Sequence, residues 1–212
     1  MKKTLILLFA LVAFVAMPES ASAQIDLTKA LGGLLGAAQS SASSSSSNSP
    51  YKKLADAAPA ASTLVGSWTY DSATFAYVGN NPLASAVVAQ LDPVAADVLK
   101  QIGVSRGTAT LKLDAGKGSV IHGDRVLAGE YKYDRSTAGI TISGVIEKVA
   151  VSVKGYVKYS APMLTVMLDV KELVEAVKSI YPEYKSDPNV VLIESLLKDM
   201  GDVFVVGKFK KQ

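Results

Sequence analysis

The sequence predicts a mainly β protein, an eight-stranded antiparallel barrel with helical insertions, and three observations indicate it. From residue 105 onward, most of the chain alternates apolar and polar residues with a period of two, as half-buried strands do. Short turn-forming loops join these stretches, which favours antiparallel neighbours. Two further apolar stretches, residues 64–78 and 203–210, would be free edges unless they pair and close the sheet. A β-sandwich is the alternative, because its strands would show the same pattern.

The first expected strand, residues 64–78, is rich in β-branched and aromatic residues and holds Trp68, the only tryptophan. The long strand 149–159 places valines on one face and lysines on the other. Turns such as Gly123-Asp124 and Ala161-Pro162 separate the strands. The remaining expected strands cover residues 109–113, 119–122, 126–133, 140–143, 163–168 and 203–210.

Two helical insertions interrupt this series of strands. Asn81-Pro82 is a helix start, and apolar residues then recur every three or four positions until Gly103. Asp92-Pro93 inside this stretch predicts a kink or a second helix start. In the second insertion Asp169, with Glu172 three residues later, is expected to cap a helix. Asp187-Pro188 should start another helix that stops at Gly201.

Residues 1–23 have the pattern of a signal peptide. Lys2 and Lys3 precede an apolar run, and Ala21-Ser22-Ala23 supplies a small-residue cleavage site. The run is shorter than the ~20 residues that a permanent membrane span requires. We therefore expect an exported mature protein, periplasmic or extracellular, without a membrane span.

Residues 24–63 are expected to form a flexible leader, and residues 64–212 the barrel domain. Serine fills eight of the ten positions 40–49, a composition that cannot bury enough surface to order itself. The formal net charge is +3, and removal of two lysines and Glu19 with the signal peptide leaves +2. This small charge gives no indication of a nucleic-acid partner. The chain has no cysteine, which excludes disulfides and thiolate chemistry.

Gly66-Ser67-Trp68 on the first strand resembles the G-x-W signature of lipocalin-type barrels. The stretch from residue 64 to residue 210 is similar to a family of uncharacterised lipocalin-like domains in exported bacterial proteins. This resemblance implies a lipocalin-like barrel and no particular activity. The two helices after the first strand depart from the usual lipocalin pattern. The resemblance is carried by Trp68 and Tyr70, Asn81-Pro82, Ile102-Gly103-Val104, Gly129-Glu130-Tyr131 and Gly207-Lys208-Phe209.

The candidate ligand-binding residues are five tyrosines that would direct hydroxyls into an apolar interior and orient a small amphipathic molecule. The alternative is that they only fill the barrel. Trp68 is expected to plug one barrel end. The candidate tyrosines are Tyr70, Tyr77, Tyr131, Tyr133 and Tyr159.

We expect no catalytic residue, metal site or cofactor. His122, the only histidine, lies at an expected hairpin tip without neighbouring residues at metal-ligand spacing. The expected function is that of an exported non-enzymatic binding protein for a small apolar or amphipathic ligand. The alternative is a structural or protein-interaction module of the cell envelope, with a filled barrel and a leader that binds an envelope protein.

Overall fold

The computed structural model describes residues 54–79, 82–89, 92, 99–100, 103–186, 190–191, 194–195, 197–198 and 202–212. The expected signal peptide, residues 24–53 of the leader and the expected helix starts at Asn81 and Asp187-Pro188 lie outside these residues. Within the described ranges, no helix is long and apolar enough to cross a membrane.

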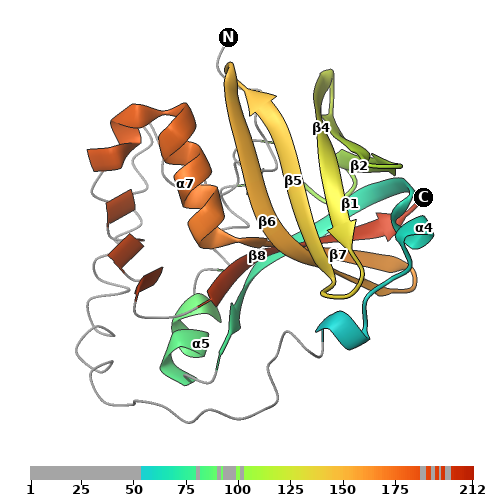
Figure 1. Ribbon diagram of the computed structural model, residues 1–212, viewed down its shortest axis with the longest axis horizontal. Helices are drawn as coiled ribbons and strands as arrows, with labels where there is room; N and C mark the ends of the chain where they lie inside the picture. The colour runs from blue at the N-terminus through green and yellow to red at the C-terminus, as the bar shows by residue number, and fades with distance from the viewer. Residues whose placement is uncertain are drawn as a thin grey trace.

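Eight antiparallel strands form one closed barrel in which each strand pairs with the next and β1 pairs with β8 (Figure 1). Tyr70 of β1 lies opposite Phe209 of β8, and Tyr77 lies opposite Val203. This pairing confirms the predicted barrel and excludes the β-sandwich. The strands are β1 (Gly66–Val78), β2 (Ala109–Asp114), β3 (Lys117–His122), β4 (Arg125–Asp134), β5 (Gly139–Ile146), β6 (Val149–Ser160), β7 (Met163–Asp169) and β8 (Asp202–Lys211).

The first strand begins two residues later than expected, because Leu64 ends a short helix, α4 (Ala61–Leu64). The indole Nε1 of Trp68 donates a 2.8 Å hydrogen bond to the carbonyl oxygen of Leu64. This bond satisfies a carbonyl that the end of a helix leaves without an intrahelical partner. The segment just before β1, which the sequence predicts to be part of the flexible leader, also contacts the barrel. Pro59 is buried, and its carbonyl oxygen accepts a 2.7 Å hydrogen bond from the Tyr133 hydroxyl.

A β-bulge at Asp71 changes which residues of β1 face the interior. The register with β8 shifts between Tyr70 and Ser72. Before the bulge Tyr70 faces inward, and after it Ala73 and Tyr77 do, because an extra residue in one strand shifts the alternation by one. Without the bulge, Tyr70 and Tyr77 would lie on opposite faces of the sheet.

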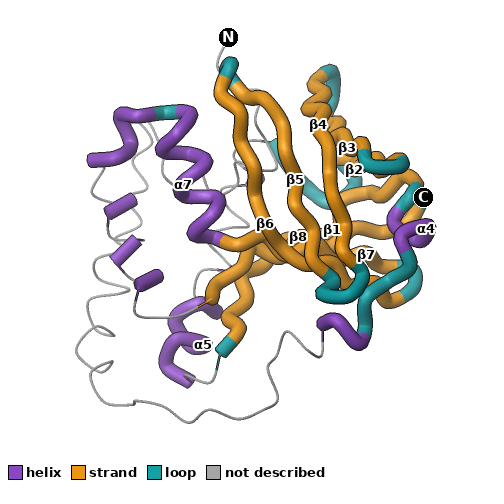
Figure 2. The backbone as a smooth tube through the Cα atoms, in the orientation of Figure 1, coloured by secondary structure: helices purple, strands orange, loops and turns teal. Residues whose placement is uncertain are grey.

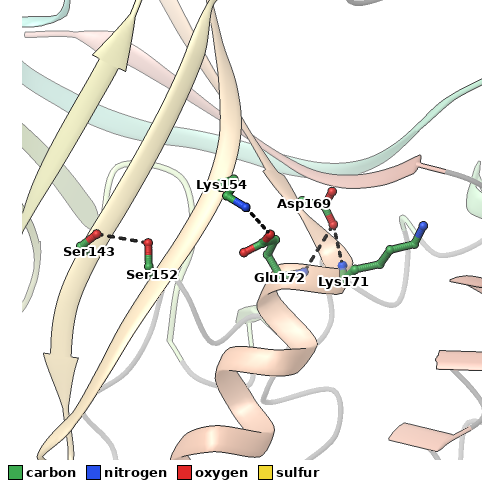
Figure 3. A network of polar contacts seen from close by, with 6 residues as sticks. All are labelled: Ser143, Ser152, Lys154, Asp169, Lys171 and Glu172. Atoms are coloured by element: carbon green, nitrogen blue, oxygen red, sulfur yellow. Dashed lines mark hydrogen bonds and ion pairs between the residues drawn. The ribbon is translucent and has the colours of Figure 1, made fainter.

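Helix α7 (Val170–Ile180) follows β7 directly and lies beside the barrel (Figure 2). The Asp169 carboxylate caps it, accepting hydrogen bonds from the backbone N–H groups of Lys171 and Glu172 (Figure 3). The expected reciprocal capping bond from Glu172 is replaced by an ion pair with Lys154 of β6, at 3.2 Å. This exposed pair links the first turn of α7 to the outer face of β6. A short 3₁₀ helix, η1 (Pro182–Ser186), comes after α7.

The interior of the barrel holds two apolar clusters. The first, the tryptophan cluster, contains Leu64, Trp68, Tyr70, Leu164 and Phe209 among others. The second, the α7 cluster, joins the apolar face of α7 to inward-facing residues of several strands. Its members include Leu173, Val174 and Val177 of α7, Val151 and Val153 of β6, and Val203 of β8.

The described part of the first insertion contacts both clusters, so it does not cover one barrel end alone. Helix α5 (Pro82–Ala89) contributes Val88 to the α7 cluster. Leu99 and Val104 belong to the tryptophan cluster. The carboxylate of Asp92 accepts a 2.6 Å hydrogen bond from the backbone N–H of Phe75, which ties the insertion to β1.

Candidate ligand-binding cavity

A cavity of about 120 Å³ lies inside the barrel between the two clusters. All eight strands contribute to its wall, together with Leu99 from the first insertion. The wall is mostly apolar, with Leu113, Ile140, Val157 and Leu164 among its residues. An apolar cavity of about 150 Å³ is known to bind benzene or xenon and to stay free of water, so this one suits an apolar group of similar or smaller size.

Glycines at inward-facing positions of three consecutive strands leave this space empty. Gly118 of β3 lies opposite Gly129 of β4, and Gly144 of β5 follows on the next strand. A Cβ atom on Gly129 would lie 2.5 Å from the carbonyl oxygen of Ser143, so only glycine fits there. A Cβ atom on Gly144 would find its nearest atom at 3.7 Å, an ordinary contact. Close strand packing therefore requires Gly129, whereas Gly144 could carry a side chain.

Two of the five candidate tyrosines, Tyr70 of β1 and Tyr131 of β4, line the cavity. Both side chains are buried, and neither hydroxyl has a hydrogen-bond partner among the described residues. Every fully buried side-chain oxygen or nitrogen in the described ranges has a hydrogen-bond partner. Because these two hydroxyls have none in those ranges, they are not fully buried and border on space that a water molecule could enter. Burial, and secondarily the charge of Asp71, raises the pKa of Tyr70 to about 12. Its hydroxyl therefore stays protonated at neutral pH and can donate a hydrogen bond to a ligand.

The other three candidate tyrosines lie outside the cavity wall. The Tyr133 hydroxyl is bound to the Pro59 carbonyl, and burial raises the pKa of this phenol. The ring of Tyr159 makes an edge-to-face contact with Trp68, with 6.0 Å between ring centroids. Tyr77 packs against the α7 cluster. The structure thus places two of the five tyrosines at the cavity and three in packing or hydrogen-bonding positions around it.

Trp68 lies at one end of the barrel, fully buried together with Leu64. Besides its hydrogen bond to Leu64, its ring contacts Tyr159 and lies below the ammonium group of Lys211, 5.2 Å from the ring centroid. Trp68 does not line the cavity. Trp68 is thus held at the start of β1 by packing and by its hydrogen bond, and its role as a plug stays a prediction.

Helix α7 closes the opposite end of the barrel. Its residues Leu173, Val174 and Val177 are each 2–3% exposed. They pack with inward-facing residues of β6 and β8 in the same cluster. Burying an aliphatic side chain of this size contributes about 1.5–3 kcal/mol, so α7 is stably packed against this end of the barrel.

His122 ends β3 and lies opposite Arg125 of the next strand. Its ring nitrogen Nε2 lies 3.0 Å from the carbonyl oxygen of Gly103. The ring therefore connects the end of the first insertion to the β3–β4 hairpin, and it does not line the cavity.

Comparison with known proteins agrees with this architecture. Residues 41–211 match the family described as Lipocalin-like domain (DUF4923). Neither a curated protein nor a solved structure gives a match. The family match covers most of the chain, and it confirms the lipocalin-like resemblance noted from the sequence. The chain therefore belongs to the Lipocalin-like domain (DUF4923) family.

Proposed function

We propose that this protein is an exported, non-enzymatic binding protein that holds a small apolar or amphipathic molecule in its barrel. The observation that carries the proposal is the cavity itself, which has an apolar wall and two accessible hydroxyls, those of Tyr70 and Tyr131. A ligand with an apolar body and one hydrogen-bonding atom would satisfy both parts of this wall.

The size of the cavity limits what can be held wholly inside. At about 120 Å³ it is smaller than the roughly 300–1,000 Å³ of pockets for drug-sized molecules. Eight-stranded barrels are just wide enough to be filled by side chains or to hold one small ligand. The ligand, or the part of it that is buried, is therefore about the size of one aromatic ring.

The proposal includes export and the absence of catalysis, both supported by the sequence. Residues 1–23 have the three parts of a signal peptide. The only histidine, His122, is bound to a backbone carbonyl away from the cavity wall. In a binding role the residues that line the cavity only contact the ligand, and none of them has to transfer a proton or attack a substrate.

The small cavity also favours a second candidate, a cell-envelope interaction module with a nearly filled barrel. In that case the segment before residue 54 would bind an envelope protein, and the barrel would serve as a rigid platform. Deleting residues 24–53 from the mature chain would then abolish capture of that partner and leave the thermal unfolding of the barrel unchanged.

Native mass spectrometry of the protein purified from its own host tests the first proposal. A co-purified small molecule, released on unfolding, is the expected result. The complementary measurement is a titration with fluorobenzene followed by fluorine NMR. Protein that carries no ligand and does not bind fluorobenzene would contradict the binding function. This result would favour the second candidate, the cell-envelope interaction module.

A further inference from the structure

The pairing between β4 and β5 ends part-way along both strands. Their ladder runs only from Asp134, paired with Gly139, to Glu130, paired with Ser143. Beyond that point β4 continues to pair with β3, and β5 continues to pair with β6 up to Ile146. Figure 1 shows the two strands close together near their connecting turn and diverging toward the other end. We call the unpaired part, residues 125–129 of β4 and 144–146 of β5, the β4–β5 slot.

The slot adjoins the cavity. Leu127, Gly129, Gly144 and Ile146 belong both to the slot and to the cavity wall. Ala128, on the outward-facing alternation of β4, also lines the cavity. The slot and the cavity therefore share part of their lining.

In the described structure both ends of the barrel are packed with buried apolar side chains. Leu64 and Trp68 are fully buried at one end, and the apolar face of α7 covers the other. Opening either end would expose buried leucine, valine or tryptophan side chains, each costing about 1.5–3 kcal/mol or more. Widening the slot separates no paired residues of β4 and β5, because their ladder ends at Glu130 and Ser143.

The outer rim of the slot is apolar on both strands. Val126 of β4 is 59% exposed and Val145 of β5 is 66% exposed, two of the four large apolar side chains that are exposed in the described structure. Polar groups follow where the strands pair again: Glu130 is exposed, and the hydroxyls of Ser143 and Ser152 lie 3.2 Å apart. An emerging ligand would thus meet apolar side chains first and polar ones next to them.

We propose that the β4–β5 slot is the entrance of the cavity and that the ligand is a single-chain amphiphile. Its apolar end fills the cavity, and the rest of its chain leaves between the strands over Val126 and Val145. This inference rests on the proposed binding function and extends it. A cavity for one ring-sized group, open to the side, suits a flexible chain, because a chain can be longer than the cavity that holds its end.

A reversible disulfide bond across the slot tests whether the slot is the entrance of the cavity. Residues Ala128 and Val145 lie on opposite sides of the slot, and the chain contains no cysteine of its own. The double variant Ala128→Cys/Val145→Cys can therefore be compared with itself in the reduced and the oxidised state. The probe is dansyl-octylamine, and its association rate is followed by energy transfer from Trp68, the only tryptophan.

The oxidised form should bind dansyl-octylamine at least about ten-fold more slowly than the reduced form and the wild type, because the disulfide bond keeps the slot from widening. Its equilibrium affinity for fluorobenzene, measured after long incubation, should stay within about two-fold of wild type, since the cavity itself is intact. Wild-type protein treated with the same oxidant is the control.

A second variant gives the same test without a disulfide. Val145→Cys capped with a bulky maleimide should slow association, whereas Val65→Cys capped in the same way should not. Val65 is an exposed valine next to α4, 40% exposed, and serves as the matched control. Unchanged association rates in both the stapled and the capped protein would overturn the slot as the entrance. Failure of the wild type to bind either probe would instead overturn the binding function.

Discussion

Replacing Ala73 by leucine should stabilise the protein and block its cavity at the same time. Ala73 faces inward from β1, opposite Gly207, and lines the cavity. Leucine adds three carbon atoms, which contribute about 0.8 kcal/mol each when buried, or about 2.4 kcal/mol. The cavity provides a second estimate, because about 24 cal/mol per Å³ over 120 Å³ corresponds to about 2.9 kcal/mol. Some strain will offset this gain, so we expect a net stabilisation of about 1–2 kcal/mol.

Thermal and chemical unfolding, together with a fluorobenzene titration, measure the two effects in the same variant. We expect a rise in Tm of about 3–6 °C for Ala73→Leu and the loss of fluorobenzene binding. Ala150→Leu, on the exposed face of β6, is the control and should change neither. A loss of more than about 1 kcal/mol in Ala73→Leu would refute the presence of usable space. Unchanged binding in a stabilised variant would place the ligand elsewhere.

Further variants test other parts of the structure. In Gly155→Ala the new Cβ would overlap the carbonyl oxygen of Met167, so equilibrium unfolding should show a loss of about 3 kcal/mol. Gly144→Ala makes only ordinary contacts and should instead add about 0.5 kcal/mol by restricting the unfolded chain. Tyr133→Phe should cost about 1 kcal/mol and speed proteolysis before β1, since the Pro59 carbonyl loses its partner; an unchanged cleavage rate would argue against this tie. Burial, opposed by two backbone N–H bonds, raises the pKa of Asp169 above 3.8. Protonation of Asp169 therefore favours the folded state. This stabilisation is fully present below pH 3.8 and is lost as the pH rises through the pKa of the folded state. The stability of wild type relative to Asp169→Asn should fall over that range, and a rise would contradict the burial effect.

The alternation of apolar and polar residues was sufficient to predict the barrel. It gave the strand that carries Trp68, the long valine-lined strand β6 and the final strand, and closure followed from the need to pair two edges. The Asp169 cap was also predictable, because aspartate before an apolar helix is a local signal. The partner of Glu172 was not, since Lys154 is brought to it only by the packing of α7 against β6.

The inward face of β1 could not be predicted through its bulge. Asp71-Ser72 carries no residue signal of a bulge such as glycine, and the shift is apparent only in the register with β8. Strict alternation from Tyr70 would have placed Ala73 outside the barrel, although it lines the cavity. For residues after a bulge, the face of the sheet on which each side chain lies therefore has to be determined from the strand pairing.

The candidate site was predicted in part, because residue type alone treats all tyrosines alike. The structure distinguishes them by what else is near: a backbone carbonyl takes the Tyr133 hydroxyl and Trp68 takes the Tyr159 ring, while Tyr70 and Tyr131 line the open space. The cavity-forming glycines were missed for a similar reason. Gly118 and Gly129 are recognisable as a facing pair only when the register of the β3–β4 hairpin is known.

Crystallography under xenon pressure tests the central claim, an apolar cavity inside a closed barrel, most directly. Xenon enters apolar cavities of this size without needing a specific polar contact. We predict one strong xenon peak inside the barrel, beside Tyr70 and Tyr131 and within reach of Gly144. A barrel interior filled by side chains, with no xenon peak among these residues, would contradict the account.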